Sequence, residues 1–295
     1  MTSPPGISIV IPTHNSSEYL KKCLPSITGQ AYPKQKFEIL VVDNNSTDDT
    51  VKIARSLGAK VITVSGTPPL VCEQRNAGAD RAIHEYVYFL DHDMELPKGF
   101  LERFASGVRK TKDRIDAWQV PEKVIGANTL IARMKTFEKM TYQGTPIASA
   151  RIIRKSIYEK TPDKFDPLLS GGPADWDFQL QLIEMGAAIG VLPFYVFHHE
   201  EFLTVVSSIN KKTGYFHGLA QYRRKWEQRD AHTVKILTDK QLGIWYRYVG
   251  VFIENGKWKE TIANFPLYLL LFGYKMLMGA RYIFHSEGWV KWIRQ

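Results

Sequence analysis

The feature that most constrains this chain is a short apolar run that ends in two aspartates, one residue apart. Residues Tyr86–Leu90 predict a buried strand, and Asp91 and Asp93 follow where that strand would end. Carboxylates beside a hydrophobic run are costly unless a positive charge lies near them. A hard cation such as Mg²⁺ or Mn²⁺ meets that need, because it takes oxygen ligands and shares them with phosphates. The alternative is a solvated turn in which an aspartate caps a helix opened by Pro97.

Strand and helix patterns alternate over the first hundred residues. The expected strands are Ile7–Ile11, Phe37–Val42, Lys60–Val64 and Tyr86–Leu90. This order predicts a parallel sheet with helices on both faces and ligands at the carboxyl ends of its strands. Polar residues gather at those ends: Thr13–Asn15, Asp43–Asn45, Arg75, Asp91 and Asp93. One polar strand end would be an ordinary cap, but several that converge on one edge predict a site.

Later segments predict a less regular mixture. Helices are expected at 97–110, 133–142 and 176–185. Strands are expected at 117–120, 147–153 and 190–197.

The composition is that of a globular protein. The chain has 295 residues, of which 44% are hydrophobic and 23% charged, enough for a large core and one large or two smaller domains. Its two cysteines, Cys23 and Cys72, give neither a disulfide framework nor zinc spacing, which fits a reducing compartment. The first residues lack a signal-peptide pattern, so a cytoplasmic protein is expected.

Positive charge is concentrated in the last third of the chain. The formal net charge is +9, and the segment from Glu201 to the end has 15 Lys and Arg against 7 Asp and Glu, a difference of 15 − 7 = +8. Such a segment favours an anionic partner: membrane lipid, a phosphate-bearing substrate or nucleic acid. Nucleic acid is not expected, because no nucleic-acid-reading motif accompanies the basic residues.

The same region is rich in aromatic residues. Trp245–Tyr248, Trp258, Trp289 and Trp292 are interleaved with Lys and Arg, and Thr261–Tyr274 contains no charge. A transmembrane helix needs about 20 apolar residues, so this run is short for one. Aromatic and basic flanks favour a helix lying at the membrane interface, peripheral on the cytoplasmic face. A helical hairpin packed on the rest of the chain, or a dimer contact, is the alternative.

Four motifs in order give a specific resemblance: Ile9–Asn15, Leu40–Asp48, Arg75–Gly78 and Phe89–Asp93. Together they resemble family 2 glycosyltransferases, which are inverting enzymes of the GT-A type. The resemblance implies a Rossmann-like nucleotide-binding domain with a mixed central sheet flanked by helices. It divides the chain into a catalytic domain at 1–225, with a nucleotide-binding half to about residue 100 and an acceptor-binding half at 101–225. Residues 226–295 are expected to form an aromatic and basic helical extension that associates with a membrane.

The resemblance also assigns residues to the donor. It implies nucleotide-sugar binding by Pro12, Thr13, Asn15, Asp43, Asn45, Arg75, Asp91 and Asp93. Asp43 would accept hydrogen bonds from the base, which is uracil in many relatives, so a UDP-sugar is the expected donor. Asp93 would ligate Mn²⁺ or Mg²⁺, with Asp91 and with His199 or His198. A cation there stabilises the charge that the leaving diphosphate gains.

The catalytic base is expected near residue 175. In the family an acidic pair supplies it, and here Asp175 aligns with the base while Ala174 stands where the first acid often lies. Asp177 is the alternative, although an acid early in a helix is commonly structural. The base would take the proton of an acceptor hydroxyl as that hydroxyl attacks the sugar. With a phosphate acceptor, Asp175 would only orient the acceptor.

The expected function is therefore sugar transfer from a nucleotide-sugar to a hydroxyl of a glycan or lipid-linked acceptor. One alternative within this class is a synthase that makes a polyprenyl-phosphate sugar. Another is a nucleotide-sugar-binding protein without catalysis, which the absent acid at Ala174 favours. A nucleotidyltransferase is less expected, because Pro12–Asn15 is not a glycine-rich phosphate loop.

Overall fold

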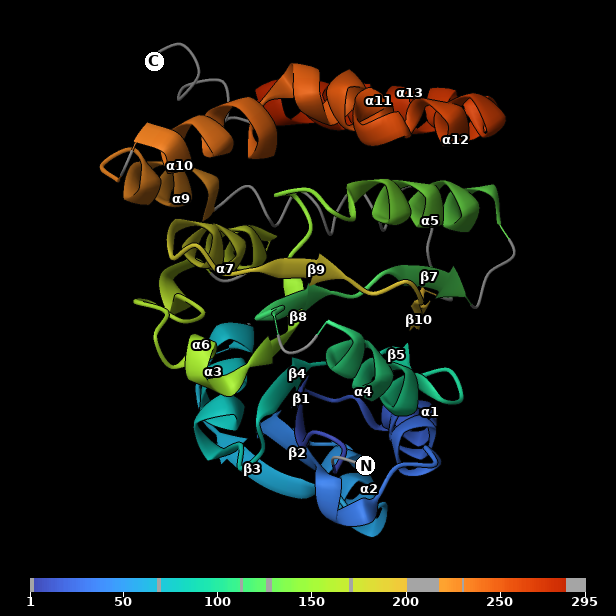
Figure 1. Ribbon diagram of the computed structural model, residues 1–295, viewed down its shortest axis with the longest axis vertical. Helices are drawn as coiled ribbons and strands as arrows, with labels where there is room; N and C mark the ends of the chain where they lie inside the picture. Colours follow the sequence, from blue (N-terminus) through green and yellow to red (C-terminus); the bar gives the residue numbers. More distant parts are fainter. Residues whose placement is uncertain are drawn as a thin grey trace.

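A seven-stranded mixed sheet forms the centre of the protein (Figure 1). Strands β1 to β4 run parallel, whereas β8 is antiparallel to both β4 and β6. This arrangement confirms the expected mixed sheet. The strands in sheet order are β3 (Lys60–Val64), β2 (Phe37–Asn44), β1 (Ile7–Thr13), β4 (Tyr86–Phe89), β8 (Ala150–Arg154), β6 (Ala117–Gln119) and β9 (Ile189–Val191).

The computed structural model describes most of the chain. The described residues are 3–67, 70–111, 114–125, 129–169, 172–200, 218–229 and 231–284. The predicted elements that involve Trp289 and Trp292 lie outside these ranges.

Helices cover both faces of the sheet because strand residues point alternately to each face. In β1, Ile9 and Ile11 pack in a core with α1 and α4, and Val10 packs in a second core with α3 and α7. All seven residues of β1 are buried, as a central parallel strand requires. The helices of these two layers are α1 (Ser17–Thr28), α2 (Thr50–Ser56), α3 (Val71–Arg81), α4 (Phe100–Lys110), α6 (Lys155–Tyr158) and α7 (Gly172–Glu184).

Helix α3 lies unusually close to the sheet at Gly78. A Cβ atom there would be 2.3 Å from Val10 Cγ1 and 3.0 Å from Val42 Cγ2, so only glycine fits. One turn earlier, the side-chain amide of Gln74 donates hydrogen bonds to the carbonyl of Thr13 at 2.8 Å and to that of Val42 at 2.7 Å. The close contact therefore fixes the start of α3 against the carboxyl ends of β1 and β2.

A second, three-stranded sheet was not foreseen. Its strands in order are β5 (Met94–Glu95), β10 (Val196–His199) and β7 (Glu122–Ile125). The prediction of one strand over 190–197 is wrong, because the chain leaves β9 at Val191, passes Pro193 and enters β10 in the other sheet. Proline lacks the N–H that a continuous ladder would use. The small sheet carries the segment after Asp93 against the histidine pair.

A layer of helices after residue 218 covers one end of the molecule (Figure 1). Its apolar core joins Leu271 and Phe252 to Met134 and Phe137 of α5 (Leu130–Tyr142). The helices are α9 (Leu219–Trp226), α10 (Ala231–Ile236), α11 (Val251–Ile253), α12 (Trp258–Ala263) and α13 (Phe265–Phe284), with π-helical turns at Leu237–Gln241 and Tyr246–Gly250. Among the described residues, no helix has both the length and the apolar character needed to cross a membrane.

Candidate functional site

Asp91 lies between two arginines at the carboxyl end of β4. Its Oδ1 accepts a hydrogen bond from Arg75 Nη2 at 3.0 Å, and its Oδ2 is 3.3 Å from Arg151 Nη2. Burial opposes ionisation of this carboxyl, but the charges of Arg151 and Arg75 outweigh it and hold the pKa of Asp91 well below its usual value. Asp91 is therefore a carboxylate at neutral pH.

The same two arginines reach Asp175 in the first turn of α7. Arg75 Nη1 donates to Asp175 Oδ1 at 2.8 Å, and Arg151 Nη2 is 3.9 Å from Asp175 Oδ2. Helix α7 begins at Gly172, earlier than the predicted 176, so Asp175 lies within the helix. Its side chain keeps 31% of its surface exposed, whereas that of Arg75 keeps 6%. Asp175 is thus an accessible carboxylate held by buried cations.

Asp93 meets a histidine of the small sheet. His198 Nε2 is 3.3 Å from Asp93 Oδ2, and His198 Nδ1 is 2.8 Å from Glu122 Oε2. Burial and nearby Lys139 lower the pKa of His198, but the hydrogen bonds to Asp93 and Glu122 outweigh them and raise it to about 9. The other oxygen of the Asp93 carboxylate, Oδ1, is buried and has no hydrogen-bond partner.

This donor set partly fits a divalent cation. Asp93 supplies an unsatisfied buried oxygen, and His198 supplies a ring nitrogen beside it. A bound cation would take the place of the proton on that ring, because histidine ligates metals in its neutral form. Among the described residues, no group of three or more His, Cys, Asp and Glu side chains is arranged to hold a metal ion. Mg²⁺ does not need such a cage, since it commonly binds through one or two carboxylates, water and substrate phosphates.

The two histidines point to different partners. His199 Nε2 contacts Glu95 Oε1, and its backbone N–H donates to the carbonyl of Asp93 at 2.8 Å. Neighbouring residues of a strand face opposite sides, so only one of the pair can turn toward the Asp93 carboxylate. The structure brings His198 to that carboxylate, and His199, the first-named of the two predicted ligands, lies against Glu95.

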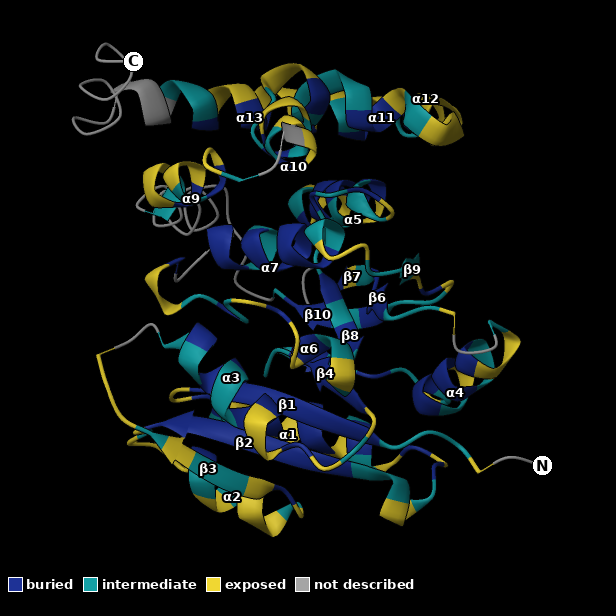
Figure 2. Ribbon diagram, turned by 60° about the vertical axis from the view of Figure 1, so that its left-hand side comes forward, coloured by how far each residue is buried: buried dark blue, intermediate teal, exposed yellow. Residues whose placement is uncertain are grey.

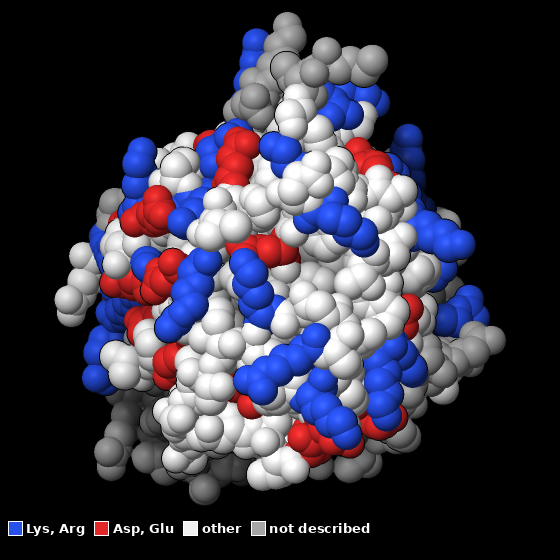
Figure 3. Space-filling model, turned by 90° about the horizontal axis from the view of Figure 1, so that it is seen from below, with Lys and Arg blue, Asp and Glu red and all other residues white. Residues whose placement is uncertain are grey.

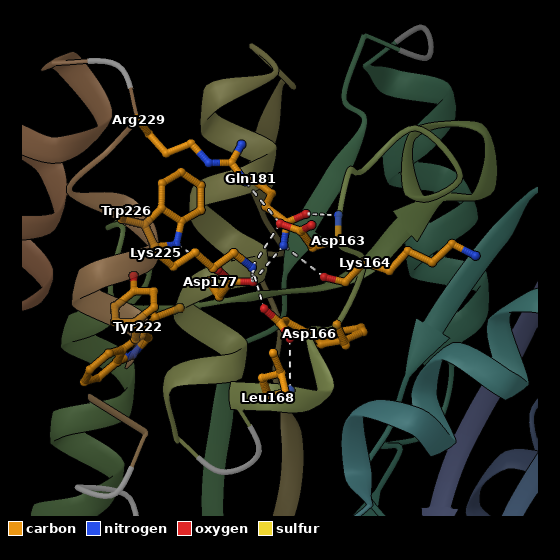
Figure 4. Close-up of polar contacts among 12 residues, drawn as sticks. Asp163, Lys164, Asp166, Leu168, Asp177, Gln181, Tyr222, Lys225, Trp226 and Arg229 are labelled. Carbon is orange, nitrogen blue, oxygen red and sulfur yellow. Dashed lines mark hydrogen bonds and ion pairs between the residues drawn. The ribbon is translucent and has the colours of Figure 1, made fainter. Parts of the chain in front are cut away.

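Asp177 lies in a separate polar cluster with Lys225, Trp226 and Gln181 (Figure 4). Its side chain is fully buried, and its oxygens accept hydrogen bonds from Trp226 Nε1 at 2.7 Å and from Lys225 Nζ at 3.0 Å. Lys225 also lies 3.0 Å from Asp163 and 2.9 Å from Asp166. These contacts enclose the Asp177 carboxylate, so the geometry favours a structural role for Asp177 and leaves Asp175 as the preferred candidate for the base.

The predicted nucleotide loops form a network of their own. Asp43 is buried and accepts hydrogen bonds from Thr13 Oγ1 at 3.0 Å and from the backbone of Ser46 at 2.9 Å. Asn15 Oδ1 accepts from the backbone N–H of Thr47 at 2.8 Å, which ties the loop after β1 to the loop after β2. The Asp43 carboxylate therefore already has partners within the protein.

The remaining predicted positions lie along this edge. Pro12 is buried, and its carbonyl is 3.2 Å from His92 Nδ1. Asn45 is exposed, with φ of 49°, the same left-handed value as Asn15. Asparagine tolerates this conformation better than most residues.

Three charged residues of the cluster escaped the sequence reasoning: Arg151, Glu122 and Lys139. Arg151 Nη2 is 3.6 Å from Glu122 Oε1, and Lys139 Nζ is 2.7 Å from Glu122 Oε2. Arg151 comes from β8, and Glu122 comes from β7, which was not predicted. The only signal for Arg151 was an arginine within the alternating run 147–153, which was interpreted as a plain strand.

Comparison with known proteins adds a family match. Residues 8–164 match the family described as Glycosyl transferase family 2. Glycosyltransferase AglE of Haloferax volcanii is 30% identical over 188 residues, which cover 60% of this chain and 62% of AglE. Poly(ribitol-phosphate) beta-N-acetylglucosaminyltransferase TarS of Staphylococcus aureus is 37% identical over 106 residues, covering 34% of this chain and 18% of TarS. The chain thus matches less than two thirds of the length of these relatives.

Solved structures resemble most of the chain. The structure of Staphylococcus aureus TarS 1–349 in complex with UDP-GlcNAc superposes with a TM-score of 0.57 at 20% identity, covering 90% of this chain and 79% of that one. Mannosyltransferase PcManGT from Pyrobaculum calidifontis, in complex with GDP-Man and Mn²⁺, gives 0.62 at 17% identity, covering 97% and 89%. These likenesses establish the fold and confirm the expected GT-A architecture.

Proposed function

Because the chain belongs to glycosyl transferase family 2, we propose that it transfers a sugar from a nucleotide-sugar donor to an acceptor hydroxyl, with inversion and with the help of a divalent metal. The observation that carries this proposal is the convergence of Asp91, Asp93 and Asp175 on one edge of the sheet, where buried Arg75 connects two of them. Carboxylates and cations at the carboxyl ends of parallel strands suit a diphosphate with a metal ion.

In this proposal the diphosphate lies beside Asp93. Asp93 and His198 would hold Mn²⁺ or Mg²⁺, which would neutralise the charge that the diphosphate gains as it leaves. The loops that carry Thr13, Asp43 and Asn45 would contact the nucleoside. UDP is the favoured nucleotide. The two solved structures described above contain UDP-GlcNAc and GDP-Man, so binding measurements with both nucleotides test this choice.

Asp175 is the proposed base. Arg75 donates a hydrogen bond to its Oδ1 and so orients the carboxyl group, and its partial exposure leaves it within reach of an acceptor. The acceptor is a glycan or a lipid-linked hydroxyl, and the protein would work at the cytoplasmic face of a membrane. A polyprenyl phosphate is the alternative acceptor, since a phosphate needs no base. A nucleotide-sugar-binding protein without turnover is the third possibility.

Calorimetric titration with a panel of nucleoside diphosphates, with and without Mn²⁺ or Mg²⁺, tests the donor site. We expect one nucleotide to bind in a metal-dependent manner and Asp93→Asn to abolish that dependence. The matched control is Glu95→Gln, which alters a carboxylate two residues away that contacts His199. If no nucleotide binds, or if both variants behave alike, the donor site is wrong.

Asp175→Asn separates the acceptor classes. Loss of turnover with unchanged nucleotide binding supports a hydroxyl acceptor, because only that reaction needs a base. Retained turnover with a polyprenyl phosphate supports the phosphate alternative. Nucleotide binding without sugar transfer to any acceptor, in the unaltered protein, supports the binding-protein alternative.

A further inference from the structure

Helix α13 has its polarity inverted relative to an ordinary surface helix. Between Thr261 and Ala280 the only charged residue is Lys275, and it faces inward with 7% of its surface exposed. Its ammonium donates to Tyr142 Oη at 2.8 Å and to the carbonyl of Arg247 at 2.9 Å, and it is 3.6 Å from Glu138. A helix that packs on a soluble protein normally buries its apolar face and exposes its charges.

On the outward face of the α12–α13 segment, from Ile262 to Leu277, every exposed residue is apolar. Five of the large side chains on this outward face recur every three or four residues. We call these five side chains the outer stripe. The members of the outer stripe are Ile262, Phe265, Leu269, Phe272 and Met276, which expose between 37% and 65% of their surface. The opposite side packs on α5 through Leu267 and Leu271. Figure 2 shows exposed residues along this outermost layer.

An apolar surface of this kind calls for a partner. The opposite end of the molecule, seen in Figure 3, has the ordinary mixture of Lys, Arg, Asp and Glu. Around the outer stripe positive charge is in excess: without the inward-facing Lys275, residues 231–280 contain five Lys and Arg and three Asp and Glu, a difference of 5 − 3 = +2. At the start of the stripe, Lys259 Nζ lies 5.7 Å from the centre of the half-exposed Trp258 ring.

We propose that the outer stripe docks on an anionic membrane surface. Lipid tails would cover the apolar side chains, and Trp258 and Lys259 would lie at the headgroup level, where tryptophan and lysine are favoured. The charge decides between lipid and a second copy of the chain, because two copies would bring together surfaces with the same positive excess. The protein lies on the bilayer in this arrangement and does not cross it.

Helix α5 connects this face to the candidate site. Glu138 of α5 lies beside Lys275, whereas the next residue, Lys139, reaches Glu122 at 2.7 Å and His198 at 2.6 Å. One helix therefore separates the docked face from the Asp93 carboxylate, and packed helices are about 8–10 Å apart. This step rests on the proposed function: a site so close to the docked face points to an acceptor that is linked to a lipid. The docking itself does not depend on the sugar chemistry.

Vesicle cosedimentation of the full chain tests the docking. We expect the protein to pellet with phosphatidylcholine vesicles that contain phosphatidylglycerol and much less with pure phosphatidylcholine, and high salt should weaken the binding. The variant Leu269→Glu/Met276→Glu should bind about tenfold or more weakly, because it places charge in the apolar contact. The matched control is Ile83→Glu/Leu168→Glu, whose side chains are 69% and 70% exposed elsewhere on the surface. It should bind like the unaltered protein.

Thermal unfolding checks that each variant is folded. Nucleotide titration of the same proteins tests the donor site separately, so that a loss of vesicle binding can be distinguished from a loss of nucleotide binding. The docking proposal is overturned if the unaltered protein stays in the supernatant with both kinds of vesicle, or if the control variant loses as much binding. It is also overturned if the unaltered protein does not bind vesicles and forms a dimer in sedimentation velocity, while the Leu269→Glu/Met276→Glu variant is a monomer. In that case a second copy of the chain covers the outer stripe.

Discussion

Replacing Asp177 with alanine should destabilise the protein without removing its chemistry, whereas replacing Asp175 with asparagine should do the reverse. Asp177 is fully buried and connects α7 to α9 through Trp226 and Lys225. Asp175, two residues earlier, is partly exposed and faces Arg75. The two positions therefore separate a structural carboxylate from a candidate base within one helical turn.

The magnitude for Asp177→Ala follows from what the change leaves behind. The indole N–H of Trp226, itself fully buried, loses its acceptor, and an unsatisfied buried donor costs about 1–3 kcal/mol. Lys225 loses one carboxylate but keeps Asp163 and Asp166, so the charge contribution is smaller than for an isolated buried pair. We expect a loss of roughly 3 kcal/mol in the free energy of unfolding. Asp177→Asn keeps an oxygen and should cost roughly half as much.

Asp175→Asn should change stability by less than about 1 kcal/mol, because the carboxylate is partly exposed and Arg75 keeps Asp91. Its turnover should fall about 10²–10⁴-fold if the acceptor is a hydroxyl. The assay is urea unfolding followed by fluorescence, with initial rates measured on folded protein. The reasoning is refuted if Asp177→Ala leaves the unfolding free energy within about 0.5 kcal/mol of the unaltered protein, or if it removes turnover while Asp175→Asn does not.

Three further changes test other parts of the structure. Gly78→Ala should destabilise the protein by about 1–3 kcal/mol, since the new Cβ would overlap Val10. Urea unfolding measures the loss, and the control is Gly107→Ala, where the new Cβ meets open space. Lys275 should make the free energy of unfolding rise with pH. Burial lowers its pKa from 10.5 to about 8, so between pH 8 and 10.5 the unfolded chain binds more protons than the folded protein. In that range the free energy of unfolding should increase by about 1.4 kcal/mol per pH unit. Lys275→Met should lack this rise in the same unfolding assay, and an identical pH profile in both proteins would contradict the assignment. Arg151→Lys should weaken nucleotide binding about tenfold by calorimetry. The shorter lysine side chain would not bring its ammonium to the position of Nη2, the atom that lies 3.3 Å from Asp91, 3.6 Å from Glu122 and 3.9 Å from Asp175. Arg154→Lys on the same strand, which pairs with Glu85, should bind normally, and equal losses would remove Arg151 from the site.

Local pattern alone determined the parallel half of the sheet. Apolar runs at Ile7–Ile11, Phe37–Val42, Lys60–Val64 and Tyr86–Leu90 became strands β1 to β4 because each has enough β-branched and aromatic residues to form a strand wherever its neighbours lie. Parallel strands bring their carboxyl ends to the same edge of a sheet, so the sequence pattern was enough to place Asp91 and the loops after β1 and β2 on one edge. The assignment of Asp175 as the base came from the family resemblance and not from the strand pattern, because Asp175 lies in helix α7.

Tertiary structure decided what lies opposite each of those residues. The split of 190–197 into β9 and β10 depends on a second sheet whose partners are distant in sequence, and it selects His198 over His199 as the neighbour of Asp93. Arg151 and Glu122 are charged residues within strands, and nothing local marks them until β7 and β8 bring them together. The inward position of Lys275 likewise depends on Glu138 of α5. Burial and pairing of charges are set by contacts between distant segments, whereas strand formation is set by neighbouring residues, and this difference divides what could be predicted from what could not.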